Sequence, residues 1–383
     1  MKLALACTGI GQVQRGFERQ FGGIFEAVRS SVDTTLFAGG GRSGDGVVRI
    51  PCLRRTGRIH RVLPLHRLIG RQPYQVECLT FALGLHRRLV RGGCDLVHLV
   101  DSPLAKVLVR LRDRAGADYR ILYMEGADLP LGLQPPADYA QYVARPKFED
   151  AVAAGVDPAS AEYVPCGIDF GRFGRSAGRE ELRRRHGIGA DTLVVLDIAA
   201  INREFKRVHW LASETARVEG DVLLWIDGSL EDPALLDEMR ARLGERLRVT
   251  HVPTSEVGDL FAIADVLAHP ALDESFGLAI VEALSCGLPV LVHDQRHFRW
   301  LVEDDRFLVD MATEGALGAR LSGLVRDRAA LRTTTPSEST WRRFEWSAVR
   351  DGLLAMYERA LRAPIGAYAR SLEAAASRAA APA

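Results

Sequence analysis

Two glutamates, Glu274 and Glu282, lie on either side of a turn that contains Gly277. The apolar run that ends at His269 predicts a strand, and the run that begins around Gly277 predicts a helix. Glycine lets backbone approach a ligand closely, and the first N–H groups of a helix bind phosphate. Carboxylates beside such a phosphate can accept hydrogen bonds from sugar hydroxyl groups. The segment therefore predicts a metal-free site for a sugar diphosphate, although for an isolated pair of glutamates solvation or helix capping is the stronger interpretation.

A longer stretch around this pair resembles the retaining glycosyltransferases of family 4. Glu274-Ser275-Phe276-Gly277 stands where that family has E-G-F-G, and Glu282 completes its E-x7-E motif. The run Ala264–Pro270 is similar to the family's A-D-V-x-x-x-P strand, and Val164–Phe173 is similar to its interdomain segment V-P-N-G-V-D-x-x-x-F. Phe344-Glu345-Trp346 resembles the F-x-W that precedes the family's closing helix. The resemblance covers most of the chain and is weaker before Val164.

The resemblance implies a role for each residue of the motif. Glu274 would bind hydroxyl groups of the transferred sugar, and Glu282 would bind the ribose of a UDP- or GDP-sugar. The other donor-binding residues of this segment would be Ser275, Phe276, Gly277 and Leu278. The backbone N–H groups of the last three would face the sugar and the diphosphate. Retention of configuration would follow from the departing phosphate assisting the incoming hydroxyl group.

A basic loop after the strand predicted at Thr192–Ile198 would complete the diphosphate site. Lys206 aligns with the family's lysine, whereas the family's arginine follows a glycine that this chain lacks, so Arg203 is assigned in its place. A preorganised lysine, arginine and helix N-terminus stabilise the charge of a leaving nucleoside diphosphate. The chain has no Asp-x-Asp sequence, so the expected enzyme uses no metal and no cofactor. A solvated lysine at a helix start is the alternative for Lys206.

The first half of the chain would bind the acceptor. Gly9 and Gly11 resemble the family's glycine-rich loop, with Gly9 on the acceptor side and Gly11 on the donor side, but a tight strand-to-helix turn explains both equally well. Asp101 follows a strand predicted at Leu96–Val100 and is an acceptor-side candidate. Where the family often has histidine, this chain has Glu125, which could accept a proton from an acceptor hydroxyl group. A salt-bridged loop residue is an equal alternative for Glu125.

Apolar runs bounded by glycine alternate with stretches of helical periodicity, which predicts parallel strands joined by helices and an α/β fold. Two doubly wound sheets are expected, and the resemblance implies the GT-B arrangement of two Rossmann-like domains facing a cleft. The expected bounds are 1–170 for the acceptor-binding domain, 171–345 for the nucleotide-sugar domain, and 346–383 for a returning helix and tail. His98 lies in an apolar run and is expected to be a core histidine. The predicted strands are Lys2–Cys7, Thr34–Ala38, Leu96–Val100, Tyr119–Met124, Glu162–Pro165, Thr192–Ile198, Val222–Ile226, Arg248–Val252, Val266–His269 and Pro289–Val292.

The composition is that of a folded protein with two domains. The 383 residues are 47% hydrophobic, and the net charge of +1 gives no support for nucleic-acid binding. No run of about 18 apolar residues occurs and the cysteines are scattered, so a cytoplasmic protein is expected. The arginine-rich stretch Arg54–Arg71 could make a weak peripheral contact with an anionic membrane, but a solvated loop is favoured because Gly57 and Pro64 interrupt an amphipathic helix. The oligomeric state stays open.

These features and the resemblance together predict a metal-independent hexosyltransferase (EC 2.4), and the resemblance implies that it is a retaining one. It would move a sugar from a nucleoside diphosphate sugar to a hydroxyl group of a small-molecule, saccharide or lipid-linked acceptor. Two other functions stay open: a nucleotide-sugar epimerase of the same fold, and a sugar-nucleotide-binding protein without transfer activity.

Overall fold

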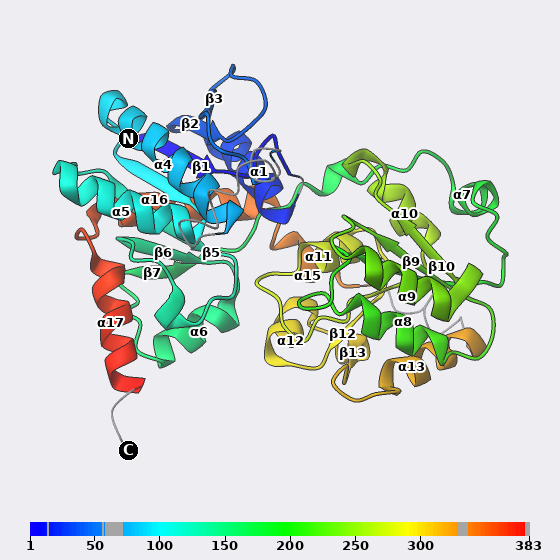
Figure 1. Ribbon diagram of the computed structural model, residues 1–383. Helices are drawn as coiled ribbons and strands as arrows, with labels where there is room; N and C mark the ends of the chain where they lie inside the picture. The colour runs from blue at the N-terminus through cyan, green and yellow to red at the C-terminus, as the bar shows by residue number, and fades with distance from the viewer. Residues whose placement is uncertain (14, 56, 58–71, 328–335, 380–383) are drawn as a thin grey trace. The chain divides into compact units, whose positions relative to one another are not determined.

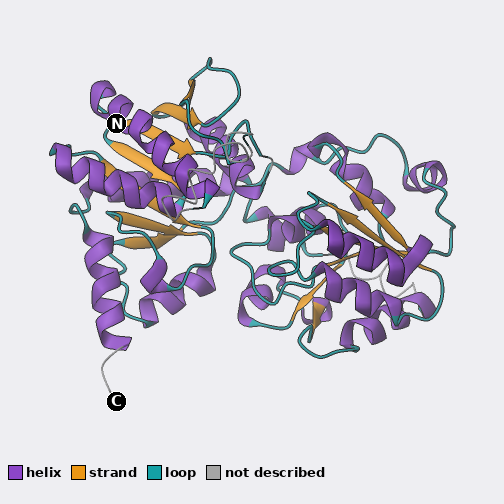
Figure 2. Cartoon of the chain, in the orientation of Figure 1, coloured by secondary structure: helices purple, strands orange, loops and turns teal. Residues whose placement is uncertain are grey.

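The computed structural model describes residues 1–13, 15–55, 57, 72–327 and 336–379. The chain divides into two compact units. The first unit comprises Met1–Ile168 and Trp346–Ala383, and the second comprises Asp169–Glu345. Each unit contains one sheet flanked by helices (Figure 1, Figure 2). The predicted α/β class with two doubly wound sheets is confirmed, because every strand pair in both sheets is parallel.

The sheet of the first unit has seven strands in the order β3-β2-β1-β4-β5-β6-β7. Its strands are β1 Lys2–Cys7, β2 Asp33–Ala38, β3 Val47–Arg49, β4 Leu96–Leu99, β5 Arg120–Glu125, β6 Tyr139–Tyr142 and β7 Ala161–Tyr163. Its helices are α1 Gly16–Val28, α4 Pro73–Gly92, α5 Ser102–Ala115, α6 Arg145–Ala153, α16 Trp346–Arg362 and α17 Ala367–Ala379, with a 3-10 turn at Leu131–Leu133. The sequence did not predict β3, which is a short edge strand, or β6, whose glutamine interrupts the apolar pattern.

The two faces of this sheet are covered by different helices, because side chains alternate along each strand. On one face, Ala4 of β1 and Val97 of β4 share a core with residues of α4 and α5, which lie side by side (Figure 1). On the other face, the His98 ring lies 5.2 Å from that of Phe21 of α1, and His98 Nδ1 lies 3.1 Å from the hydroxyl oxygen of Tyr357 of α16. The prediction of a core histidine at position 98 is confirmed.

The sheet of the second unit has six strands in the order β10-β9-β8-β11-β12-β13. Its strands are β8 Leu193–Ile198, β9 Val222–Asp227, β10 Leu247–Thr250, β11 Val266–Ala268, β12 Val290–His293 and β13 Leu308–Val309. Its helices are α7 Arg179–Arg185, α8 Val208–Ala216, α9 Pro233–Leu243, α10 Val257–Ile263, α11 Leu278–Ser285, α12 Arg296–Val302, α13 Ala316–Arg326 and α15 Glu338–Arg342. Shorter 3-10 turns occupy Phe170–Arg172, Gly244–Arg246, Thr254–Glu256 and Asp305–Phe307. The two-residue strand β13 was not predicted.

In both sheets the strand order reverses beside the first strand of the unit. β1 pairs with β2 on one side and with β4 on the other, and β8 pairs in the same way with β9 and β11. Loops diverge at such a switch point and leave a crevice at the carboxyl ends of the strands, which is where doubly wound sheets bind ligands. The residues that follow β1, β4, β8 and β11 therefore lie at the sheet edges where ligands are expected to bind. No helix of the described residues has the length and apolar character needed to cross a membrane.

Candidate active site

The turn between β11 and α11 has the backbone geometry that the motif predicts. Gly277 has a φ of 98° and directly precedes the first residue of α11, Leu278. A Cβ at Gly277 would lie 2.9 Å from a methyl carbon of Leu301, so a side chain at this position would be strained by both backbone and packing. The first N–H groups of a helix have no acceptor within the helix. The turn therefore presents backbone donors where the sequence predicts a diphosphate.

The side chain of Phe276 is buried and packs against other aromatic rings, which holds this turn in place. It is 3% exposed, and its ring lies edge-on to that of Phe344, with the centroids 5.1 Å apart. The ring of Trp300 packs against both. His297 Nε2 donates to the carbonyl oxygen of Phe276 over 3.0 Å. The side chain of Phe276 is thus part of the core, and only its backbone is available for the predicted role.

Glu274 is held by two basic side chains. Its Oε1 lies 2.8 Å from Nε2 of His269 and also pairs with Nζ of Lys206. Burial opposes its ionisation, but the hydrogen bond from His269 and the charge of Lys206 prevail and lower the pKa of Glu274 well below its usual range. Glu274 is therefore a permanent carboxylate at neutral pH.

His269 and Asp197 extend this pair into a buried chain of charges. Nδ1 of His269 lies 2.9 Å from Oδ1 of Asp197, and both residues are almost fully buried. The contact arises because β8 and β11 are neighbours in the sheet, with Leu196 beside Leu267. The sequence analysis missed both residues. The available signals were an aspartate inside the apolar run of β8 and a histidine at the end of β11.

The second glutamate of the motif is also buried and paired. Glu282 is 1% exposed, and its Oε1 forms an ion pair with Nη2 of Arg172. The Arg172 guanidinium in turn lies over the ring of Phe173, 4.6 Å from its centroid. Because Glu274 and Glu282 have side chains only 13% and 2% exposed, a pair of solvated glutamates is excluded. Arg172 was not predicted, although it lies in the interdomain segment.

Three basic side chains of the loop between β8 and α8 contact different partners. Lys206 reaches Glu274, as described above. Arg203 is 43% exposed and pairs instead with Asp232, 3.3 Å away, and with Glu238 of α9. Arg207 has a φ of 48° at the start of α8, and its Nη1 donates to the carbonyl oxygens of Pro270 and Met311, each over 2.9 Å. Lys206 thus contacts the motif at Glu274, whereas Arg203 contacts Glu238 of α9.

The glycines after β1 are required by close packing. Gly11 has a φ of 72°, and a Cβ there would lie 2.5 Å from the backbone of Gly40. A Cβ at Gly9 would overlap the carboxylate of Glu18. Both glycines therefore have a structural reason that involves no ligand, as the tight-turn interpretation required.

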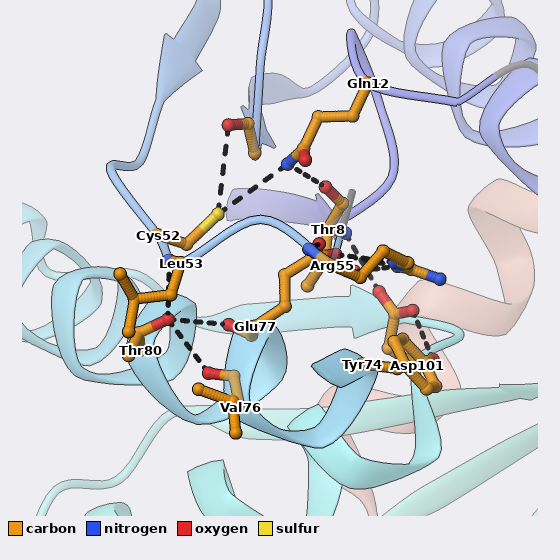
Figure 3. A network of polar contacts seen from close by, with 11 residues as sticks. Thr8, Gln12, Cys52, Leu53, Arg55, Tyr74, Val76, Glu77, Thr80 and Asp101 are labelled. Carbon is orange, nitrogen blue, oxygen red and sulfur yellow. Dashed lines mark hydrogen bonds and ion pairs between the residues drawn. The ribbon is translucent and has the colours of Figure 1, made fainter. Parts of the chain in front are cut away.

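Asp101 belongs to a polar network at the ends of β1 and β4 (Figure 3). It accepts hydrogen bonds from the N–H of Thr8 over 2.9 Å and from the hydroxyl group of Tyr74 over 2.6 Å. Arg55 joins the same network, 2.7 Å from Glu77 and 3.0 Å from the hydroxyl oxygen of Thr8. The Arg55 side chain is thus held within this network and is 18% exposed. The rest of the arginine-rich stretch, residues 58–71, lies outside the described residues.

Glu125 ends β5 in an environment that favours the neutral acid. It is 2% exposed and accepts a hydrogen bond from the N–H of Leu129 over 3.3 Å. Burial, with a further contribution from Asp128, raises the pKa of Glu125 to about 7. Lys147 pairs with Asp128 rather than with Glu125. No salt bridge to Glu125 is present in the described parts of the chain.

A comparison with known protein families finds a match in the sequence. Residues 192–327 match the model of the glycosyl transferases group 1 family. The second unit carries this match to the family. Its members are glycosyltransferases, enzymes of class EC 2.4, so the resemblance inferred from the motif is confirmed.

Curated relatives match longer parts of the chain. The chain is 30% identical over 215 residues to the D-inositol 3-phosphate glycosyltransferase of Mycobacteroides abscessus. This alignment covers 54% of the present chain and 48% of the Mycobacteroides protein. The corresponding enzyme of Segniliparus rotundus is 29% identical over 286 residues, covering 69% of this chain and 63% of that protein. The chain thus spans about half to two thirds of the length of these relatives.

Solved glycosyltransferase structures have the same fold over almost the whole chain. Sucrose-phosphate synthase from Thermosynechococcus elongatus superposes with a TM-score of 0.72 at 18% identity, covering 94% of this chain and 98% of that one. Anabaena Alr3699/HepE, solved in complex with UDP-glucose, superposes with a TM-score of 0.71 at 17% identity, covering 94% and 99%. The GT-B fold predicted for this chain is confirmed.

Proposed function

We propose that the chain is a retaining, metal-independent glycosyltransferase that transfers a sugar from a nucleoside diphosphate sugar to a hydroxyl group. The observation that carries this proposal is the ionised carboxylate of Glu274, held by Lys206 and His269 beside the N-terminus of α11. A permanent anion whose side chain is only 13% exposed is suited to accept hydrogen bonds from sugar hydroxyl groups. Backbone N–H groups beside it are suited to a diphosphate.

The second unit would bind the donor. The diphosphate would lie on the N–H groups of Phe276, Gly277 and Leu278, with Ser275 in the same turn. Lys206 would move from Glu274 to the phosphate oxygens as negative charge develops there, which lowers the barrier to departure of the nucleoside diphosphate. Arg203 would supply a second cation after leaving its partners on α9.

The ribose would be bound by Glu282. Its carboxylate forms an ion pair with Arg172, and the oxygens of a carboxylate can accept hydrogen bonds from two neighbouring hydroxyl groups. Support for a uridine nucleotide comes from the Anabaena relative, which was solved with UDP-glucose. A UDP-sugar is therefore the first donor to test, and a GDP-sugar the second.

The first unit would bind the acceptor near Asp101 and Glu125, with Gly9 on the acceptor side of the loop after β1 and Gly11 on its donor side. In the reaction, the acceptor oxygen bonds to the anomeric carbon while the bond from that carbon to the phosphate oxygen breaks. The proton of the acceptor passes to a phosphate oxygen or to Glu125. A carboxyl group whose pKa lies near 7 is suited to accepting it.

Incubation of the protein with UDP-glucose, other UDP-sugars and GDP-sugars tests this proposal, first without and then with small saccharide and polyol acceptors. We expect slow release of nucleoside diphosphate without acceptor and faster release with one, together with a glycosylated product of retained configuration. An isomeric sugar nucleotide formed without acceptor would show an epimerase. Tight binding of an intact donor under all conditions would show a binding protein.

A further inference from the structure

We propose that His269 is a positioning residue of the donor site, which keeps the Glu274 carboxylate oriented when Lys206 turns to the diphosphate. The inference rests on the proposed function and extends it to the pair His269 and Asp197, which the motif does not contain. It depends on three observations: the double bridge of His269, its burial, and the different exposure of the two cations that share Glu274.

The double bridge requires both ring nitrogens of His269 to be donors. Nδ1 lies 2.9 Å from Asp197 and Nε2 lies 2.8 Å from Glu274, and the two partners are acidic oxygens. An ionised carboxylate only accepts hydrogen bonds, and a neutral imidazole has a single N–H. The imidazolium therefore satisfies both contacts at once, and Asp197 fixes the ring so that Nε2 stays aimed at Glu274.

The two cations on Glu274 differ in how readily they can leave. The His269 side chain is 3% exposed and is bonded at both ring nitrogens, whereas that of Lys206 is 28% exposed and has a long, flexible stem. A diphosphate on the N-terminus of α11 would compete with Glu274 for the lysine. The histidine stays in place, so Glu274 remains ionised and correctly aimed at the sugar.

The charges around His269 favour its protonated form. Asp197 faces it from β8, Glu274 faces it from the loop after β11, and Lys206 lies beyond Glu274. Arg207 reaches the same loop at the carbonyl oxygen of Pro270. Burial alone would remove the charge, but the two carboxylates outweigh it and raise the pKa of His269 to about 9.

The first test is kinetic and uses His269→Gln, with His251→Gln as the matched control because His251 is exposed on the loop after β10. We expect His269→Gln to lower kcat/KM for the sugar nucleotide by about 10-fold or more, since misplaced contacts to the reacting sugar are costly. The Kd for the free nucleoside diphosphate should change less than about twofold, because Glu274 binds the sugar. An equal loss of nucleotide affinity would indicate a merely structural role and overturn the proposal.

The second test is the pH profile with Asp197→Asn. In the wild type, kcat/KM should fall above about pH 9 as His269 loses its proton. Removing the charge of Asp197 should move this fall to lower pH, and His269→Gln should abolish it. An alkaline limb that is the same in all three proteins would overturn the proposal, and it would assign that limb to another group.

A third readout needs no activity, and so separates this inference from the proposed function. Ring ¹⁵N signals of histidine, assigned to His269 by their loss in His269→Gln, should show both nitrogens protonated at pH 7.5. A neutral ring at that pH would overturn the double bridge. If the wild type cleaves no sugar nucleotide, the proposed function fails, whereas the imidazolium is decided by this spectrum alone.

Discussion

The strand-end edges of the two sheets place carboxylates in opposite electrostatic settings. In the second unit, Lys206 and His269 lower the pKa of Glu274, so that it is an anion at all physiological pH values. In the first unit, Glu125 is more deeply buried and forms no salt bridge with a described residue, and burial raises its pKa to about 7. Burial alone thus does not decide the state of an acid. The cations supplied by neighbouring loops decide it.

This difference corresponds to two kinds of chemistry on one fold. A permanent carboxylate suits the binding of hydroxyl groups, and a carboxyl group that titrates near neutrality suits proton transfer. The contrast arises in the loops, since both sheets have the same parallel order around their switch points. The loop after β8 carries Lys206, whereas the loop after β5 carries Asp128 beside Glu125.

The largest effect is expected for Glu274→Gln. We expect kcat to fall by about 1,000-fold, because the amide gives up the permanent charge that Lys206 and His269 organise. The far-ultraviolet circular dichroism should stay unchanged. Asp273→Asn, which alters the exposed neighbouring acid, should remain close to wild type. Turnover by Glu274→Gln within threefold of the wild type would remove this residue from the site.

The second-largest effect is expected for Lys206→Met. The kcat should fall by about 100-fold, because the developing charge of the leaving group loses the stabilising lysine. Steady-state release of nucleoside diphosphate measures the effect. The variant keeps the length of the side chain, so a mere packing defect is not expected. A raised KM with unchanged kcat would instead indicate that Lys206 binds ground state and transition state equally.

Glu125→Gln tests the other side of the comparison through its pH dependence. With acceptor present, wild-type kcat/KM should rise with pH through about 7 as Glu125 loses its proton. The variant should lack this rise and be about 10- to 100-fold slower at pH 8. Acceptor-free hydrolysis of the donor serves as the control and should change little. The same acidic limb in the variant would contradict a role for Glu125 as base.

Arg203→Ala should have a smaller effect, about threefold to tenfold in kcat/KM, because Arg203 must first leave Asp232 and Glu238 to reach the donor. Asp232→Asn with Glu238→Gln would release it and should raise the contribution of Arg203, which a double-mutant comparison measures. A loss as large as that of Lys206→Met would make the two cations equal partners.

The smallest effect concerns stability. Glu125 releases its proton at an ordinary pKa near 4.5 when unfolded but only at about 7 when folded. The stability that this group contributes is therefore fully present below about pH 4.5 and is lost as pH rises through about 7. Between pH 5 and pH 8, the Tm of the wild type should fall relative to that of Glu125→Gln. Parallel Tm curves for the two proteins would show that Glu125 is not buried as described.

Much of the framework could be read from local patterns. The predicted strands correspond to ten of those observed, within one or two residues at their ends, because buried parallel strands appear as short apolar runs. The strands β3, β6 and β13 were missed because they are short or interrupted by polar residues. The positions of Glu274, Glu282 and Gly277 also followed from their spacing around one turn.

Tertiary structure alone decided what each motif residue contacts. Asp197 is 72 residues from His269, and Arg172 is 110 residues from Glu282, so neither partner follows from local spacing. The sequence also did not indicate whether Arg203 or Lys206 contacts Glu274, because these residues are three positions apart and yet contact different partners. Sequence determined the turn and its acids because those depend on neighbouring residues. The charge state of the acids depends on groups that only the pairing of β8 with β11 and the packing of distant segments bring within hydrogen-bonding distance.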